Sequence, residues 1–223
     1  MPEFDEVEVT QAYERCASRK ESHLQDIEKI VVNSGSSLEG NSFYLHNSLQ
    51  RFPDLYSKQL NLFWCGTQAK TKICEIGFNA GHSAMLLLLG RDTTPIDFTI
   101  FDIGHHRYTR PCLEYIASNF PHAKFGYVEG DSTRTMPDWI EKHKSMVETY
   151  DVVHVDGGHS EHCIFNDMKN ANFLVKKGGI VIVDDTNMSY INDYVNIYLK
   201  SGKYREMDVV KTKGYQHRII QKL

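Results

Sequence analysis

The feature that most constrains this chain is an alternation, from residue 71 onward, of short apolar runs with longer stretches of helical periodicity. Strands that alternate with helices are typical of a mostly parallel sheet with helices on both faces, so the sequence predicts an α/β fold. The five strands expected are 71–77, 96–102, 123–131, 150–156 and 178–185. The helices expected are 81–91, 107–120, 134–148, 161–178 and 188–202.

Two further strand candidates finish the chain, at 204–210 and 215–223. Only the four residues Lys-Thr-Lys-Gly separate them, and a short connection of this kind favours an antiparallel hairpin. We expect this hairpin at the edge of the sheet.

The first 70 residues show a different sequence pattern. Helical periodicity over 10–33, with Thr10 as its cap, is followed by a small-residue loop at 33–42. We expect a second helix over 43–52 and a third over 54–65 that is closed by Gly66. The chain is therefore divided into a helical region, 1–70, and a sheet region, 71–223, which together form one compact domain.

Bulk properties exclude several classes of function. The 223 residues suit one domain, and a net charge of −4 gives no basic face for nucleic acid. The N-terminus is acidic, unlike a secretory signal, and the longest apolar run is too short for a membrane span. Five scattered cysteines read as reduced thiols, so we expect a cytoplasmic protein with no membrane partner.

Acidic residues stand at or near the ends of all five expected strands. Asp is a common turn residue, which explains any one of them, but it explains the whole series poorly. Ligands in open α/β sheets bind beyond the carboxyl ends of the strands, so the series predicts a site there. The acids are Glu75, Asp102, Asp131, Asp156, Asp184 and Asp185.

A glycine-rich turn follows the first expected strand. Its pattern is E-x-G-x-x-x-G, from Glu75 to Gly81, and not the dinucleotide pattern G-x-G-x-x-G, because position 79 is Asn. Gly77 permits a tight turn, and Gly81 lets an anion approach the free N–H groups of the next helix. Glu75 would repel a pyrophosphate and attract an ammonium group, so a ligand that carries both carboxylate and ammonium fits best.

The stretch Cys-Glu-Ile-Gly-Phe-Asn-Ala-Gly-His-Ser-Ala, 74–84, resembles motif I of class I S-adenosylmethionine-dependent methyltransferases. It is especially similar to the metal-dependent O-methyltransferases of catechols and caffeoyl-CoA. The resemblance extends over about 71–223. It implies a Rossmann-like, seven-stranded methyltransferase sheet, with the helical 1–70 region as a substrate lid.

The same resemblance implies how the cofactor S-adenosylmethionine binds. Ser83 would meet the methionine carboxylate, Asp102 the ribose hydroxyls, and the turn at Asp131 and Ser132 the adenine. Ser132 could instead cap the helix that follows. The whole cofactor set expected is Glu75, Gly77, Phe78, Asn79, Gly81, His82, Ser83, Asp102, Ile103, Asp131, Ser132 and Asp156.

Metal-dependent members of the family carry one Asp after strand four and an acidic pair after strand five, and Asp156, Asp184 and Asp185 match these places. Three converging carboxylates repel one another unless a cation is present. Oxygen ligands select Mg²⁺ or Mn²⁺. Zinc is disfavoured, because the local histidines and cysteine lack a second ligand pair.

His159 stands where the catechol and caffeoyl-CoA enzymes have a catalytic lysine. Histidine titrates near neutral pH, so His159 is the expected base that takes the acceptor's proton; its alternative role is to cap the next helix. His154 lies between two valines and is expected to be buried, whereas Glu161 and His162 are expected to be bystanders on a helix face.

Gly158 replaces the aromatic residue that walls the ring site of catechol enzymes, and the Asp-Asp pair is closer to macrocin-type sugar O-methyltransferases. The expected acceptor is therefore the hydroxyl of a small molecule, a sugar or polyol, with a phenol or catechol as the alternative. Three other readings are weighed: a nucleotide-cofactor oxidoreductase, a non-catalytic binding module, and an RNA or protein methyltransferase. A homodimer is left open.

Overall fold

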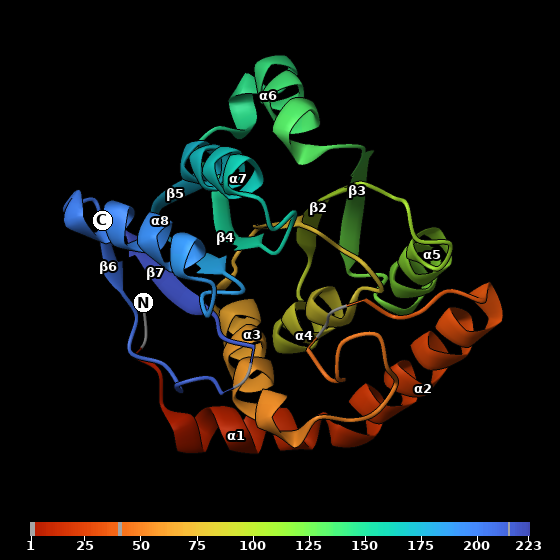
Figure 1. Ribbon diagram of the computed structural model, residues 1–223. Coiled ribbons are helices and arrows are strands. Elements are labelled where there is room, and N and C mark those ends of the chain that lie inside the picture. The colour runs from red at the N-terminus through yellow and green to blue at the C-terminus, as the bar shows by residue number, and fades with distance from the viewer. Residues whose placement is uncertain (1–2, 40–41, 214) are drawn as a thin grey trace.

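The computed structural model describes residues 3–39, 42–213 and 215–223. Its centre is a seven-stranded sheet with the order β3-β2-β1-β4-β5-β7-β6 (Figure 1). The first five strands are parallel and β7 is antiparallel to both neighbours, which confirms the expected fold class. The strands are β1 (Lys72–Ile76), β2 (Ile96–Asp102), β3 (Ala123–Glu129), β4 (Tyr150–Val155), β5 (Val175–Val183), β6 (Tyr204–Glu206) and β7 (Arg218–Lys222).

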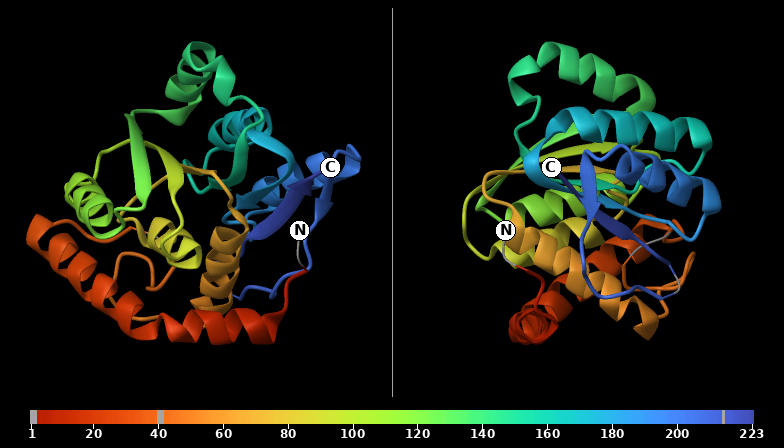
Figure 2. Two further views of the ribbon diagram at one scale, coloured as in Figure 1. Left: turned by 180° about the vertical axis from the view of Figure 1, so that it is seen from behind. Right: turned by 90° about the vertical axis from the view of Figure 1, so that its left-hand side faces the viewer.

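Helices cover both faces of the sheet, as Figures 1 and 2 show. One hydrophobic cluster joins one face to α3, α4 and α5, and α1 and α2 pack outside these helices. A second cluster joins the other face to α6, α7 and α8. The helices of the sheet region are α4 (His82–Arg91), α5 (Thr109–Asn119), α6 (Ser132–Lys142), α7 (Glu161–Leu174) and α8 (Ser189–Lys200).

The strand β4 illustrates why these apolar runs become central strands. Every residue from Tyr150 to Val155 is buried, because β1 and β5 pair with it on either side and helices cover both faces. His154 is fully buried within it, as expected from its position between two valines.

The C-terminal strands pair as expected, but their connection is longer than predicted. β6 ends at Glu206 and β7 begins at Arg218, so residues 207–217 link them instead of four residues. β7 also pairs with β5, which places it inside the sheet and leaves β6 at the edge.

The N-terminal region departs most from the sequence predictions. Two helices, α1 (Glu6–Arg15) and α2 (Ala17–Ser34), replace the single one expected, and Asp5 rather than Thr10 caps the first. The expected helix over 43–52 is wrong: Phe43 and Phe52 pair through the backbone, and Tyr44 and Arg51 form an isolated antiparallel bridge.

The third expected helix is present but extends past its predicted end. A short 3-10 turn, Pro53–Leu55, leads into α3 (Tyr56–Gln68), so Gly66 lies inside the helix instead of closing it. A Cβ at Gly66 would lie 2.1 Å from the carbonyl oxygen of Leu87 in α4, so this glycine permits close packing of the two helices. No helix in the described part of the chain is long and apolar enough to cross a membrane.

Candidate active site

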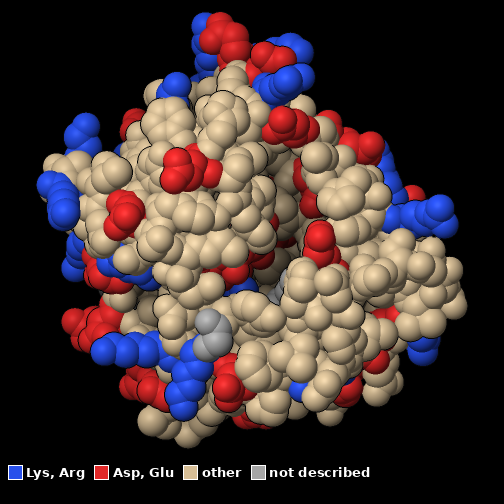
Figure 3. Space-filling model, in the orientation of Figure 1, with Lys and Arg blue, Asp and Glu red and all other residues tan. Residues whose placement is uncertain are grey.

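The predicted acids gather at the carboxyl edge of the sheet. Glu75 lies in β1 and Asp102 ends β2, while Asp156 follows β4 and the pair Asp184 and Asp185 follows β5. Figure 3 shows a hollow in this face of the molecule with acidic side chains in its walls. The edge that the sequence singled out is therefore an open site lined by carboxylates.

Gly77 brings the turns after β1 and β4 together. Its φ is +88°, and a Cβ at this position would lie 1.9 Å from the carbonyl oxygen of Asp156. Any other residue would collide with the neighbouring backbone and would also be strained. The N–H of Asp156 donates to Ile76 at 2.9 Å, which fixes the same approach from the other side.

Glu75 is fully buried at the floor of the site. Its Oε1 accepts a hydrogen bond from the Ser83 hydroxyl at 2.6 Å and lies 3.0 Å from Nδ1 of His154. Its Oε2 has no hydrogen-bond partner among the described residues. A buried carboxylate oxygen without a donor is costly, which is consistent with a ligand that brings a donor to it.

Asp102 organises the glycine-rich turn. Its Oδ2 accepts from the backbone N–H groups of Phe78 and Asn79 at 2.7 and 2.9 Å, and its Oδ1 accepts from Gly104 at 2.7 Å. Each carboxylate oxygen can accept more than one hydrogen bond, so ribose hydroxyls could still bind there. The ring of Phe78 is buried and lies against Gly81, so Phe78 meets the turn through its ring as well as through its backbone N–H.

The remaining expected cofactor residues differ in whether they face the site. Asp131, not Ser132, is the N-cap of α6, because its carboxylate accepts from the N–H of Thr133 at 2.9 Å. Ile103 is exposed just past Asp102. His82 points away into the core against Phe43, and burial lowers its pKa to about 3.

His159 and Asp185 form a hydrogen-bonded pair at the rim. Nε2 of His159 lies 2.7 Å from Oδ2 of Asp185, and this contact raises the pKa of His159 above its usual value. Asp185 has a φ of +54°, an uncommon backbone conformation for a residue with a side chain. The Tyr190 hydroxyl donates to the carbonyl oxygen of His159 and holds the loop. Ser160, not His159, caps α7.

Lys58 is a site residue that the sequence did not reveal. It lies in α3, is only 3% exposed, and its ammonium contacts Oδ2 of Asp184. Burial favours the neutral amine, but Asp184 and then Asp156 raise the pKa of Lys58 above its usual value. Gln59 and Asn61 are buried in the same helix, so the sequence pattern of α3 did not single out Lys58.

The three carboxyl groups fall into two overlapping groups of ligand atoms that share Asp156. Ligand atoms of His154, Asp156 and Asp184 lie within 4.8 Å of one another, as do those of Asp156, His159 and Asp185. No such group within residues 3–39, 42–213 and 215–223 contains all three of the predicted metal ligands. Burial and the neighbouring Asp184 raise the pKa of Asp156 well above its usual value.

Side chains of α7 lie against Gly157 and Gly158, the two glycines that follow Asp156. A Cβ at Gly157 would lie 2.7 Å from Oδ2 of Asp167, and one at Gly158 would lie 2.8 Å from Sγ of Cys163. Side chains of α7 thus fill the volume that larger residues would need. His162 is exposed on that helix, as expected.

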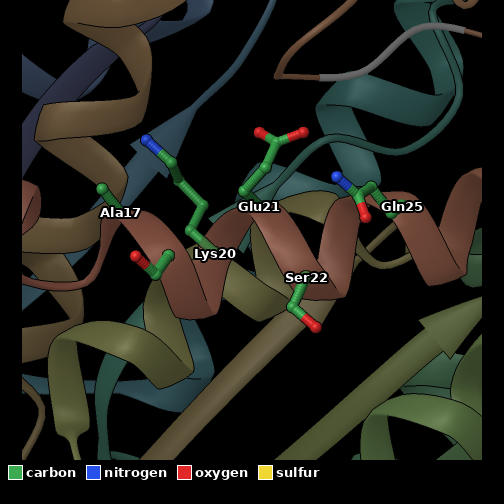
Figure 4. Close-up of a pocket in the computed structure, with 6 residues that line it drawn as sticks. Ala17, Lys20, Glu21, Ser22 and Gln25 are labelled. Carbon is green, nitrogen blue, oxygen red and sulfur yellow. The ribbon is translucent and has the colours of Figure 1, made fainter.

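A second hollow lies on α2, far along the chain from these acids. Lys20, Glu21 and Gln25 line it with their neighbours, and Figure 4 shows that all of the residues drawn come from this one helix. None of the predicted site residues belongs to it, so it is a surface feature of the N-terminal region.

Solved structures share this fold across almost the whole chain. An O-methyltransferase from Bacillus cereus, in complex with SAH, is 16% identical, with 91% of this chain and 90% of that one covered and a TM-score of 0.61. TomG from Streptomyces achromogenes, an O-methyltransferase of tomaymycin synthesis in complex with SAM, is also 16% identical, with coverage of 74% and 79% and a TM-score of 0.52. A Corynebacterium glutamicum protein is 12% identical, with coverage of 98% and 97% and a TM-score of 0.61.

No curated protein sequence matches the chain significantly. The family described as a methyltransferase domain matches residues 74–186, just over half of the chain. This match runs from the glycine-rich turn through Asp184 and Asp185, and so includes the acids at the carboxyl edge of the sheet. The chain therefore belongs to the methyltransferase-domain family.

Proposed function

We propose that this protein transfers a methyl group from S-adenosylmethionine to a hydroxyl of a small molecule. The observation that carries the proposal is the His159–Asp185 pair, which lies at the same sheet edge as the buried Glu75 turn. Structural neighbours that are O-methyltransferases in complex with SAH or SAM support the same reaction.

The cofactor site follows from the donors and acceptors of the first turn. Oε2 of Glu75 would accept from the methionine ammonium, and the N-terminus of α4 at Ser83 would face the carboxylate. Asp102 would bind the ribose, and the turn at Asp131 the adenine. When bound, S-adenosylmethionine supplies an electrophilic methyl group on its sulfur.

His159 would act as the general base. Because Nε2 faces Asp185, Nδ1 is the nitrogen that takes the proton of the acceptor hydroxyl. The acceptor oxygen then forms a bond to the methyl carbon, while the bond from that carbon to sulfur breaks. Asp185 orients the imidazole and stabilises its protonated form, as an acidic partner of histidine does in other enzymes.

The Mg²⁺ or Mn²⁺ that the resemblance implies does not fit the three-carboxylate arrangement. The Lys58 ammonium already contacts Oδ2 of Asp184, and Asp184 does not join Asp156 and Asp185 in one ligand group of the described chain. No step of the proposed reaction is therefore assigned to a metal ion.

We infer a sugar or polyol as the acceptor, because no aromatic side chain stands at Gly158 and because the rim carboxylates can accept hydrogen bonds from neighbouring hydroxyls. A phenol is the second candidate. Its hydroxyl is far more acidic than that of a sugar, so His159 could deprotonate it with less assistance.

The test is transfer of label from S-adenosylmethionine to a panel of sugars and phenols. Each acceptor is assayed with EDTA and with added Mg²⁺, and binding of S-adenosylhomocysteine is measured by calorimetry. Labelled sugar ether is the expected product. Tight binding of NADH with no binding of S-adenosylhomocysteine would replace this proposal with an oxidoreductase.

A further inference from the structure

The carboxyl cluster needs positive charge from some source. Asp184 is 3% exposed, and Asp156 and Asp185 are half-buried beside it. Carboxylates removed from water repel one another and are stable only when a cation or a proton compensates them. The source of that compensation decides whether the site has room for a metal ion.

The structure places one buried cation against the Asp184 member of this cluster. Among the described residues, Lys58 is the only Lys or Arg that is buried, and its ammonium contacts Asp184 directly. The two side chains are only 4% and 1% exposed, so water does not screen their contact.

The surroundings of Lys58 keep its ammonium in place. Helix α3 packs closely on α4 at Gly66 and Leu87, so the backbone that carries Lys58 cannot withdraw without disturbing the core. One turn further along α3, the Asn61 amide lies 2.9 Å from Nε2 of His217 and donates to the carbonyl oxygen of Val210 at 2.8 Å. These contacts tie α3 to the segment before β7.

We propose that the Lys58 ammonium is the resident cation of this centre, and that it occupies Asp184 in place of a divalent metal ion. The proposal rests on the proposed function, because it concerns the same site, and it makes methyl transfer independent of metal. Lys58 is a positioning residue: it holds Asp184, and through it the acid cluster, while His159 performs the proton transfer.

Two features distinguish an ammonium from a divalent ion here. The Lys58 ammonium is part of the chain itself, so it needs no free ion and a chelator cannot remove it. It also leaves Asp185 free to pair with His159, whereas a metal ion bound by all three carboxylates would take Asp185 from the imidazole.

The experiment measures metal binding directly, on the full chain saturated with S-adenosylhomocysteine. Titration with Mn²⁺, followed by electron paramagnetic resonance, should show no saturable site in the unchanged protein. Lys58→Met removes the ammonium and keeps an apolar side chain of similar length, so the vacated Asp184 should now support one-to-one Mn²⁺ binding. The double variant Lys58→Met with Asp184→Asn should lose that binding again.

Lys29→Met is the matched control. Lys29 also contacts a carboxylate, Asp26 at 2.8 Å, but this pair is exposed on α2, so the variant should bind no more Mn²⁺ than the unchanged protein. Circular dichroism establishes that each variant is folded. If Lys58→Met does not fold, the titration of the unchanged protein still decides the question.

Saturable one-to-one Mn²⁺ binding by the unchanged protein, or loss of methyl transfer in EDTA, would overturn the proposal. Binding that disappears in Asp185→Asn would then identify Asp156, His159 and Asp185 as the metal site. A folded Lys58→Met variant that binds no Mn²⁺ would also contradict it. Binding of S-adenosylhomocysteine is scored separately, so failure of the proposed methyl transfer is distinguishable from failure of this inference.

Discussion

Nε2 of His159 lies 2.7 Å from Oδ2 of Asp185, and this contact joins the loop after β4 to the loop after β5. The left-handed backbone of Asp185 turns its carboxylate towards the imidazole. The proposed base and its acidic partner thus come from the loops that follow two adjacent strands. Their pairing depends on the parallel register of β4 and β5, which aligns Val155 with Val183.

The first prediction concerns the pH dependence of methyl transfer. His159 must be neutral to take a proton, and Asp185 raises its pKa above the ordinary 6.5, so kcat/KM should rise with pH through that raised value. Asp185→Asn removes the cause of the shift and should move the acidic limb of the profile to lower pH. His159→Ala should reduce kcat by about 10²–10⁴ and leave S-adenosylhomocysteine binding intact.

His162→Ala is the control for that experiment, because this histidine is exposed on α7 three residues further along the chain. It should leave the profile unchanged. Near-normal turnover by His159→Ala, or an acidic limb that does not move in Asp185→Asn, would remove the pair from the mechanism.

The second prediction concerns Glu75, at the floor of the proposed cofactor site. Glu75→Gln keeps the shape of the side chain but removes the charge that would meet the methionine ammonium. Loss of a charged hydrogen-bond partner typically costs about 1.5–3 kcal/mol, so the Kd for S-adenosylhomocysteine should rise by about 10–100-fold in calorimetry. Glu141→Gln is the matched control, because Glu141 lies on α6 in an exposed ion pair with Lys144, just past the end of that helix. Equal Kd values for the two variants would show that Glu75 does not bind the cofactor.

The third prediction concerns the turn after β1. Gly77→Ala combines a positive φ with a collision between its Cβ and the carbonyl oxygen of Asp156. Gly178→Ala has a similar φ of +77° but no atom within 4 Å, so it isolates the cost of the backbone conformation alone. We expect Gly178→Ala to lower the free energy of unfolding by about 1–2 kcal/mol. Gly77→Ala should lower it by about 1–3 kcal/mol more, measured by urea denaturation; equal losses would refute the collision.

The fourth prediction concerns Asp167, a buried carboxyl group in α7. Burial raises its pKa from 3.8 to about 6. Well below pH 3.8 the group is protonated whether the chain is folded or unfolded, so its burial costs no stability there. Between about pH 4 and pH 6 the unfolded chain loses this proton while the folded protein keeps it, so stability falls across that range and levels off above it.

Asp167→Asn should therefore raise the free energy of unfolding by about 1–3 kcal/mol near pH 7.5, with little effect near pH 4. Urea denaturation at the two pH values measures this. Asp97, an exposed residue of β2, provides the control variant Asp97→Asn, whose effect should be the same at both values. A gain for Asp167→Asn that does not depend on pH would exclude the buried charge as its cause.

The sheet was predictable because strands that are buried on both faces appear in the sequence as short continuous apolar runs. β4 is buried along its whole length, and its apolar run between Tyr150 and Asp156 could be read directly. The capping of α6 by Asp131 and of α7 by Ser160 depends on local geometry, which residue identity alone left ambiguous. The length of the link before β7 was missed because strand-like residues continue past Glu206.

The contacts between distant segments were not predictable from the sequence. Lys58 and Asp184 are separated by more than half of the chain, and nothing in the apolar periodicity of α3 indicates which buried position faces the acids. The same limit applies to 43–52, where helical periodicity is overridden because Phe43 and Tyr44 are buried in the core. Pairing between His159 and Asp185 likewise required the register of two strands.

The origin of Lys58 in α3 has a consequence for how such a protein can diversify. The family match begins at residue 74, yet the charge that balances Asp184 is supplied from upstream of that boundary. A chimera that exchanged the first 70 residues for those of a relative, in order to change the acceptor, would also exchange the counter-ion of the centre. Such grafts should keep the charge of the site balanced only when the donor segment brings a cation to the same place, so the electrostatics of the site depend on a segment outside the family match.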